Sequence, residues 1–221
     1  MSMFYCIETL SDENIGRIIE APYLYYAFEG DEESYIEKKS EEIINSRNPV
    51  YRKLSQSELS KKLGLFQPNK ESMAIEDFKT GPNEKQRLES LGDNLEPDES
   101  WTPFQACFVS YFMKKCGLGD WVFSMMGDGL YLKEIELEVY TTENIRTGLE
   151  KFDESKLAIT IEDSDLQILL ERRIIRDEEE LDYYKNNKEK AALWVETCIL
   201  NLKKELDNCI DMKVGLTISL C

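Results

Sequence analysis

The chain has 221 residues, of which 42% are hydrophobic and 10% aromatic, so it can bury a substantial core, and its length favours one domain with an insertion. The 44 Asp and Glu residues outnumber the 27 Lys and Arg residues, and because the net charge of −17 repels nucleic-acid phosphate and anionic lipid, we expect neither nucleic acid nor a membrane as a partner. The chain contains no histidine, which excludes Ser-His-Asp and Cys-His catalysis and the H-E-x-x-H metal site.

Residues 3–10 form the first predicted element, a strand buried on both faces, because aromatic and β-branched side chains dominate this segment. Ser11 is placed to cap a helix that ends ahead of Pro22, whose ring disfavours helix in the residue before it. The side chains expected on the buried face of this helix are Ile15, Ile18 and Ile19. The opening segment lacks the basic and apolar regions of a signal peptide, so we expect a cytoplasmic protein.

Residues 23–28 are a dense aromatic run, for which core packing is favoured over an exposed contact surface. An acidic stretch follows directly, and its members are Glu29, Asp31, Glu32 and Glu33. Residues 35–95 differ from the rest of the chain, because they are polar, weakly helical at first and then rich in turn residues. Within them, residues 51–90 hold eight basic against six acidic residues. We interpret 35–95 as an insertion that decorates the core.

The helix from Thr102 to Lys115 is the strongest predicted element. Thr102 is a suitable cap, Pro103 fits the first helical position, and Gln105 stands at the capping-box spacing. Gly117 stands where a left-handed residue closes a helix. The side chains expected on the core-facing stripe are Phe104, Cys107, Phe108, Tyr111 and Phe112.

Two strands are predicted after this helix. The apolar run at 121–126 lies between turn glycines and is interpreted as a central strand. Residues 131–140 alternate between apolar and acidic side chains, which predicts a strand with one face in water. The exposed face would be an acidic ladder of Glu134, Glu136 and Glu138.

The remaining chain predicts a short helix after Thr142, a helix over about 163–170, a long amphipathic helix over about 178–206 and, after a turn at 207–208, a strand over 212–220. Together these elements predict an α+β fold with a single mixed sheet of four or five strands covered by helices. We expect one domain over residues 1–221, with 35–95 as a polar insertion of helix and loop.

Several motifs fall short of a recognisable site. The glycines at 117–119 and 127–129 complete no phosphate-binding loop, so they are interpreted as turn residues. The acids at 163–165 and 177–180 are explained by the preference of helix N-termini for negative charge rather than by a calcium or magnesium site. We therefore assign no catalytic, cofactor-binding or metal-binding residue and expect no cofactor.

A groove is a further candidate feature, with core or rim packing as the alternative for its tryptophans. Its residues are Trp101, Asp120, Trp121 and Asp128. A pair of carboxylates among Asp98, Glu99, Asp120 and Asp128 could serve a hydrolase, but no spacing in the sequence sets the carboxyl separation that this chemistry needs. Six cysteines at long intervals resemble neither a zinc ribbon nor a disulfide scaffold, so we expect most of them to be small buried side chains.

The opening MSMFYCIETLSDENIGRIIEAP resembles the start, strand and S-D-E-x-I helix of the bacterial YfbM-like family. Ser100-Trp101 resembles the start of that family's tryptophan helix, and residues 129–153 and 181–220 resemble its later strands and helices. The chain departs from the family in its Ser2, which replaces a glycine, in its long middle segment, and in lacking a basic residue ahead of the tryptophan. The resemblance implies a small α+β fold and no assigned activity.

These features predict a non-enzymatic acidic protein of the immunity or inhibitor type, which masks a basic protein partner. The residues of the predicted contact surface are Glu29, Asp31, Glu32, Glu33, Glu134, Glu136 and Glu138. Two alternatives remain open. One is a hydrolase that uses carboxylates with or without a divalent metal, and the other is a structural or oligomer-forming protein that associates through the aromatic run at 23–28.

Overall fold

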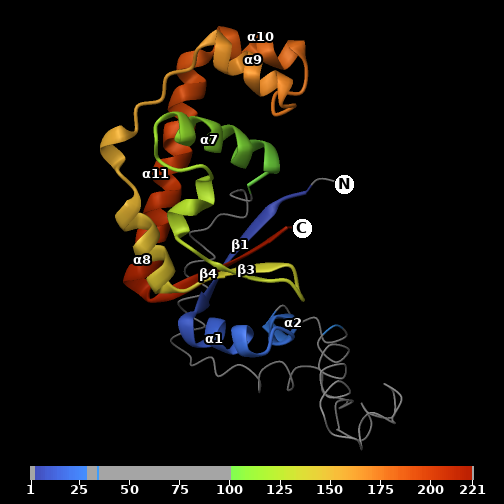
Figure 1. Ribbon diagram of the computed structural model, residues 1–221, viewed down its shortest axis with the longest axis vertical. Helices are drawn as coiled ribbons and strands as arrows, with labels where there is room; N and C mark the ends of the chain where they lie inside the picture. The colour runs from blue at the N-terminus through green and yellow to red at the C-terminus, as the bar shows by residue number, and fades with distance from the viewer. Residues whose placement is uncertain (1–2, 29–33, 35–100, 221) are drawn as a thin grey trace, which may run out of the picture.

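The computed structural model of the chain describes residues 3–28, 34 and 101–220 (Figure 1). Its strands are β1 (Tyr5–Ser11), β2 (Leu130–Leu132), β3 (Leu137–Tyr140) and β4 (Val214–Leu220), and they form one sheet in the order β1-β4-β3-β2. The short helices α1 (Asp12–Glu20) and α2 (Leu24–Phe28) lie on one side of this sheet. The longer helices α7 (Pro103–Lys115) and α11 (Lys188–Met212) lie on the other side. This arrangement confirms the predicted α+β class.

The first and last strands of the described chain are neighbours in the sheet. β1 pairs with β4 over seven residues, from Tyr5 opposite Leu220 to Ser11 opposite Val214, and β4 pairs with β3 on its other side. All three pairings between the described strands are antiparallel, whereas we expected a mixed sheet. The helices between β3 and β4, residues 142–212, bring the chain back to the end of the sheet at which β3 stops, so β4 runs antiparallel to β3.

The helices α1 and α2 cover one face of the sheet; α1 was predicted, whereas residues 24–28 were expected to pack in the core but not as a helix. The Ser11 side chain caps α1 by accepting a hydrogen bond from the Asn14 amide at 3.1 Å. The apolar residues buried on this face are Leu10, Ile15, Ile18, Leu24, Tyr25, Leu132, Leu137 and Val139. Ile19 is 37% exposed, so its predicted burial is wrong, because residues 15 and 18 already fill the face of α1 that meets the sheet. The buried Leu24 and Tyr25 agree with core packing of the aromatic run.

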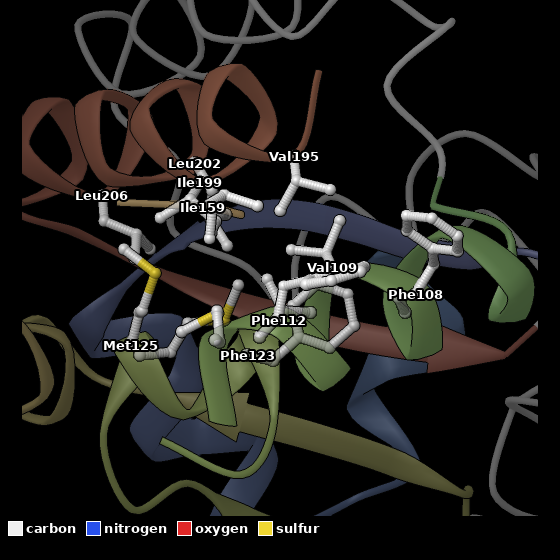
Figure 2. Close-up of a cluster of buried hydrophobic side chains, with 14 of the residues drawn as sticks. Phe108, Val109, Phe112, Phe123, Met125, Ile159, Val195, Ile199, Leu202 and Leu206 are labelled. Atoms are coloured by element: carbon white, nitrogen blue, oxygen red, sulfur yellow. The ribbon is translucent and has the colours of Figure 1, made fainter. Parts of the chain in front are cut away.

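The helix α7 begins with the predicted capping box. The Thr102 amide donates to the Gln105 side chain at 2.9 Å, and the Gln105 amide donates to the Thr102 hydroxyl at 3.1 Å. The predicted stripe is only partly correct, because α7 packs both against α11 and against residues 122–126, which follow α7 in the chain (Figure 2). Phe108 and Phe112 are buried as expected, and so are Ala106, Val109 and Met113, whereas Phe104, Cys107 and Tyr111 are half-buried.

Residues 121–126 do not form the predicted strand. Val122–Met126 is a 3-10 helix, η3, four of whose five side chains are buried. The Val122 amide at its start donates to the buried Ser110 hydroxyl of α7 at 2.8 Å, which satisfies an amide that a strand would have given to a neighbour. An uninterrupted apolar run fits a buried helix or a buried strand equally well, and this explains the error.

Residues 131–140 form a hairpin instead of one strand. β2 and β3 pair through Leu130 opposite Val139, Tyr131 opposite Glu138 and Leu132 opposite Leu137, and the turn between them has Glu136 at a φ of 52°. The predicted acidic ladder is therefore wrong: residues 134 and 136 lie in the turn, and only Glu138 lies in a strand.

The predicted helices after the sheet are present with small shifts. α8 (Thr142–Lys151) is capped by the Thr141 hydroxyl, one residue earlier than expected. It is followed by the short 3-10 helix η4 (Glu154–Lys156) and by α9 (Asp163–Glu171), which matches the helix predicted over 163–170.

The predicted long helix is two helices, α10 (Glu178–Asn186) and α11, with a break at Asn187. The side-chain amides of Asn186 and Asn187 donate to the carbonyls of Asp182 and Tyr183, each at 2.8 Å. Such side chains compete with the backbone for helical hydrogen bonds, which favours a helix end at this point. The predicted turn at 207–208 is also wrong, because α11 runs to Met212 and ends at the left-handed Lys213.

Two further predictions concern the burial of the cysteines and the insertion at 35–95. Cys209 is buried, but Cys6, Cys107, Cys116 and Cys198 are half-buried, so most described thiols are less buried than expected. In the described ranges no helix has the length and apolar character to cross a bilayer. The predicted insertion at 35–95 lies outside the described residues.

Candidate functional site

A pocket of about 340 Å³ lies between η3 and the β2–β3 hairpin. The residues that line it are Trp121, Phe123, Ser124, Gly127, Asp128, Gly129, Tyr131, Glu138 and Tyr140. Four of the nine are aromatic and two are acidic, and none is basic. A pocket of this size and composition suits a small organic group with some positive charge.

Glycines allow the chain to form one wall of this pocket. Gly127 has a φ of 83°, which side chains rarely adopt, and it ends η3. A Cβ atom at Gly129 would come within 2.5 Å of the Tyr140 ring, so only glycine lets the backbone pass this close to the ring. The Asn144 side chain of α8 donates to the Asp128 carbonyl at 2.9 Å and fixes the loop between the two glycines.

Edge-to-face ring contacts hold the aromatic wall in place. The rings of Trp121 and Phe123 are 5.4 Å apart at 83°, and Tyr5 of β1 contacts both, at 5.8 and 5.4 Å. Phe123 is almost fully buried, and Trp121 is half-buried at the rim. The Tyr131 side chain of β2 also lines the pocket and is 54% exposed. The wall is thus rigid at its base, since such ring pairs have a preferred geometry.

The acidic centre of the pocket is Glu138. The Tyr140 hydroxyl donates to its Oε2 at 2.5 Å, and burial together with this hydrogen bond raises the pKa of Tyr140 far above its ordinary value. Burial, Cys107 and Glu138 also raise the pKa of Tyr5. Both phenols therefore stay protonated near neutral pH, so they can donate hydrogen bonds but cannot act as bases. Among the described residues, Glu138 forms no ion pair.

Asp128 supplies a second carboxylate at the mouth of the pocket. Its side chain is 95% exposed and lies 3.5 Å from the Lys151 ammonium, at the long end of a salt bridge. An exposed pair of this kind contributes little and exchanges readily with other partners. Asp128 is therefore available to a cation that enters the pocket from solvent.

The candidate groove of the sequence coincides with the pocket at two positions. Trp121 and Asp128 line it, whereas Trp101 does not, although its ring centre lies 5.7 Å from that of Phe123. Asp120 lies outside the lining, is 80% exposed and pairs with Lys114 at 2.9 Å. The other two acids considered for a hydrolase, at positions 98 and 99, lie outside the described residues.

The predicted acidic contact surface is described only in part. Residues 29 and 31–33 lie outside the described ranges, Glu134 and Glu136 are exposed in the hairpin turn, and Glu138 faces the pocket. The pocket role of Glu138, Tyr131 and Tyr140 was missed, because it depends on the hairpin register. The cross-strand pairing of residues 131 and 138 would have revealed it if the turn had been recognised.

A second polar cluster joins α7 to the start of α9. Asp165 is 4% exposed and accepts hydrogen bonds from the Tyr111 hydroxyl at 3.0 Å, the Lys115 ammonium at 2.6 Å and the Glu162 amide at 2.8 Å. The Arg172 guanidinium lies 5.8 Å from the centre of the Tyr111 ring. Each polar group here has a partner within the fold, which indicates a structural role. Within the described ranges, no three acidic or thiol side chains gather as a metal site.

Comparisons with known proteins found no relative of the chain. No protein-family model, no curated protein and no solved structure matches the chain. The resemblance to the YfbM-like family therefore stays a prediction.

Proposed function

We propose that this protein is a non-enzymatic binding protein that masks a basic protein partner, in the manner of immunity or inhibitor proteins. The observation that carries the proposal is the pocket centred on Glu138: a carboxylate without a cationic partner among the described residues, set against aromatic rings. The net charge of −17 would draw a basic protein toward this surface and speed its association.

The groups around the pocket support binding better than catalysis. The chain has no histidine to transfer protons near neutral pH, and the two phenols with shifted pKa values, Tyr5 and Tyr140, are held in the protonated form. A hydrogen-bonded carboxylate and fixed rings need no proton transfer to attract a cation, so recognition of positive charge is the simpler use of this arrangement.

Calorimetric titration against a panel of basic and acidic proteins of similar size tests the proposal. At least one basic protein should bind, and its affinity should fall between about 0.02 M and about 0.2 M salt, whereas the acidic proteins should not bind. In stopped-flow mixing with a basic protein that binds, the double variant Glu134→Gln, Glu136→Gln should slow association more than it speeds dissociation, because both side chains lie in the exposed hairpin turn. Absence of binding to every basic protein, or an affinity that salt leaves unchanged, would argue against masking.

A carboxylate-dependent hydrolase is the second candidate. It is favoured by one observation, that Asp128 and Glu138 line the same pocket. Thermal unfolding in the presence of Mg²⁺, Ca²⁺, Mn²⁺ or Zn²⁺ separates this candidate from a masking protein, because a bound metal raises the unfolding temperature. A rise that Asp128→Asn abolishes would favour the hydrolase over the binding protein.

A further inference from the structure

We propose that the pocket between η3 and the hairpin receives the guanidinium group of an arginine side chain from the basic partner. This inference rests on the proposed function and deepens it, since it assigns the residue that anchors the partner. The pocket joins two features that recognise a planar cation, namely aromatic faces and a carboxylate oriented by a hydrogen bond.

The aromatic faces come from two separate elements. Trp121 at the start of η3 and Tyr131 of β2 form the rim, and Phe123 and Tyr140 form the buried base. The contacts of Tyr5 with Trp121 and Phe123 fix the ring planes, so little side-chain entropy is lost when a ligand enters. Trp121 is half-buried and Tyr131 is exposed, so the rings that line the pocket are reachable from solvent.

The carboxylate of Glu138 is positioned for a charge-assisted hydrogen bond. Its Oε2 accepts the Tyr140 hydroxyl, and this contact restrains the side chain in the pocket while the second oxygen has no hydrogen-bond partner among the described residues. The guanidinium presents several N–H donors in one plane, so it can bond to this carboxylate while its face lies on a ring. The exposed Asp128 carboxylate is paired with Lys151 at 3.5 Å, and it contributes to cation binding only where the guanidinium replaces this partner.

The chemistry of the pocket selects arginine over the other charged groups. Glu138, which forms no ion pair with a described residue, repels phosphate and carboxylate ligands, and the lining holds no basic side chain to offset it. A lysine ammonium is compact and strongly hydrated, so it loses more on entry between rings than the weakly hydrated guanidinium does. The net charge of −17 attracts a cation that approaches the protein surface to within the screening length.

Titration with N-acetyl-arginine methylamide tests the inference directly, with N-acetyl-lysine methylamide as the matched probe. Two-dimensional NMR should show shifts of the Trp121 indole, with an affinity for the arginine probe in the millimolar range and about tenfold above that for the lysine probe. Glu138→Gln keeps an acceptor for the Tyr140 hydroxyl but removes the charge, and it should weaken the arginine probe about tenfold or more. Tyr131→Leu should weaken it several-fold by removing one ring at an exposed position.

Glu150→Gln is the control, because it removes the same charge from an exposed position of α8 outside the pocket lining. It should change the affinity by less than about twofold. Equal effects of the two Glu→Gln variants, equal binding of the two probes, or shifts that avoid Trp121 would overturn the inference, provided that the variants unfold at the wild-type temperature.

The two proposals fail in different ways. If a basic protein binds the Glu138→Gln variant as tightly as the wild type, the arginine anchor is refuted and the masking role stands. If the arginine probe binds in the pocket and no basic protein binds the surface, the masking role is refuted and the pocket chemistry stands.

Discussion

Asp165→Asn should destabilise the protein far more than its position at a helix start suggests. The carboxylate is 4% exposed and accepts three hydrogen bonds, from the side chains of Tyr111 and Lys115 and from the Glu162 amide. A hydrogen bond to a charged group contributes about 1.5–3 kcal/mol to stability. The bond from Lys115 counts for less, because this side chain is 36% exposed and its ammonium can be hydrated when the bond is lost. Because asparagine keeps one acceptor oxygen, we expect a loss of about 2–3 kcal/mol in the free energy of unfolding.

Asp163→Asn provides a matched control two residues away. Both positions lie in the first turn of α9 and interact with the same helix dipole, but the Asp163 side chain is 70% exposed and pairs with Lys188 on the surface. Its loss should cost less than about 1 kcal/mol. Urea unfolding followed by tryptophan fluorescence measures both variants on one scale. Equal losses would show that helix-terminal charge, and not the buried cluster, accounts for Asp165.

The pH dependence gives a second readout of Asp165. Burial alone would raise the pKa of this carboxyl, but hydrogen bonds from Lys115, the Glu162 amide and Tyr111 outweigh burial and lower the pKa. A lowered folded-state pKa adds stability above the unfolded value of about 4, and this stability is lost as the pH falls through the folded pKa. The difference between wild type and Asp165→Asn should therefore shrink below about pH 4. A difference that stays constant from neutral to acidic pH would refute the reasoning.

Three shorter predictions concern packing, backbone and thiol reactivity. Gly148→Ala should lower the free energy of unfolding by about 3 kcal/mol or more, because the new Cβ atom would clash with the backbone of Gly127. The Cβ atom of Gly16→Ala meets nothing within 4 Å, so this variant should be more stable than the wild type by about 0.5–1 kcal/mol. Thermal unfolding measures both variants. Lys213→Gly should raise the free energy of unfolding by about 1 kcal/mol and therefore raise the urea midpoint, because residue 213 has a φ of 57° and glycine adopts this conformation without strain; an unchanged midpoint would count against it. Cys209 should resist iodoacetamide at about pH 8 in the native state, since burial raises its pKa to about 12, and peptide mass spectrometry would show labelling only after unfolding.

The starts of α1 and α7 were predictable because a side chain caps each of them. Ser11 and Thr102 cap their helices through the expected contacts, because capping depends on residues three positions apart and hence on local sequence. The break at Asn187 escaped prediction because the apolar spacing continues across it. Two adjacent asparagines were the available signal, and their side chains do bond back to the preceding turn.

The pocket was only half predictable. Trp121 and Asp128 were named from composition and position, but Glu138 was assigned to an exposed ladder. Its true surroundings depend on the hairpin, which pairs it with Tyr131, and on η3, whose preceding residue Trp121 lines the same pocket. Apolar alternation is the same in one long strand and in two short ones, so the pattern alone cannot place a reversal of the chain.

The pairing of β1 with β4 has a consequence for biosynthesis. The partner of Ser11 is Val214, so about 200 residues must leave the ribosome before the N-terminal strand can find its neighbour. At translation rates of about 5–20 residues per second, this strand waits for roughly 10–40 seconds with an unpaired edge. Completion of the sheet is then a late, long-range closure, and a nascent chain stalled ahead of β4 is the species most exposed to aggregation and to chaperone capture.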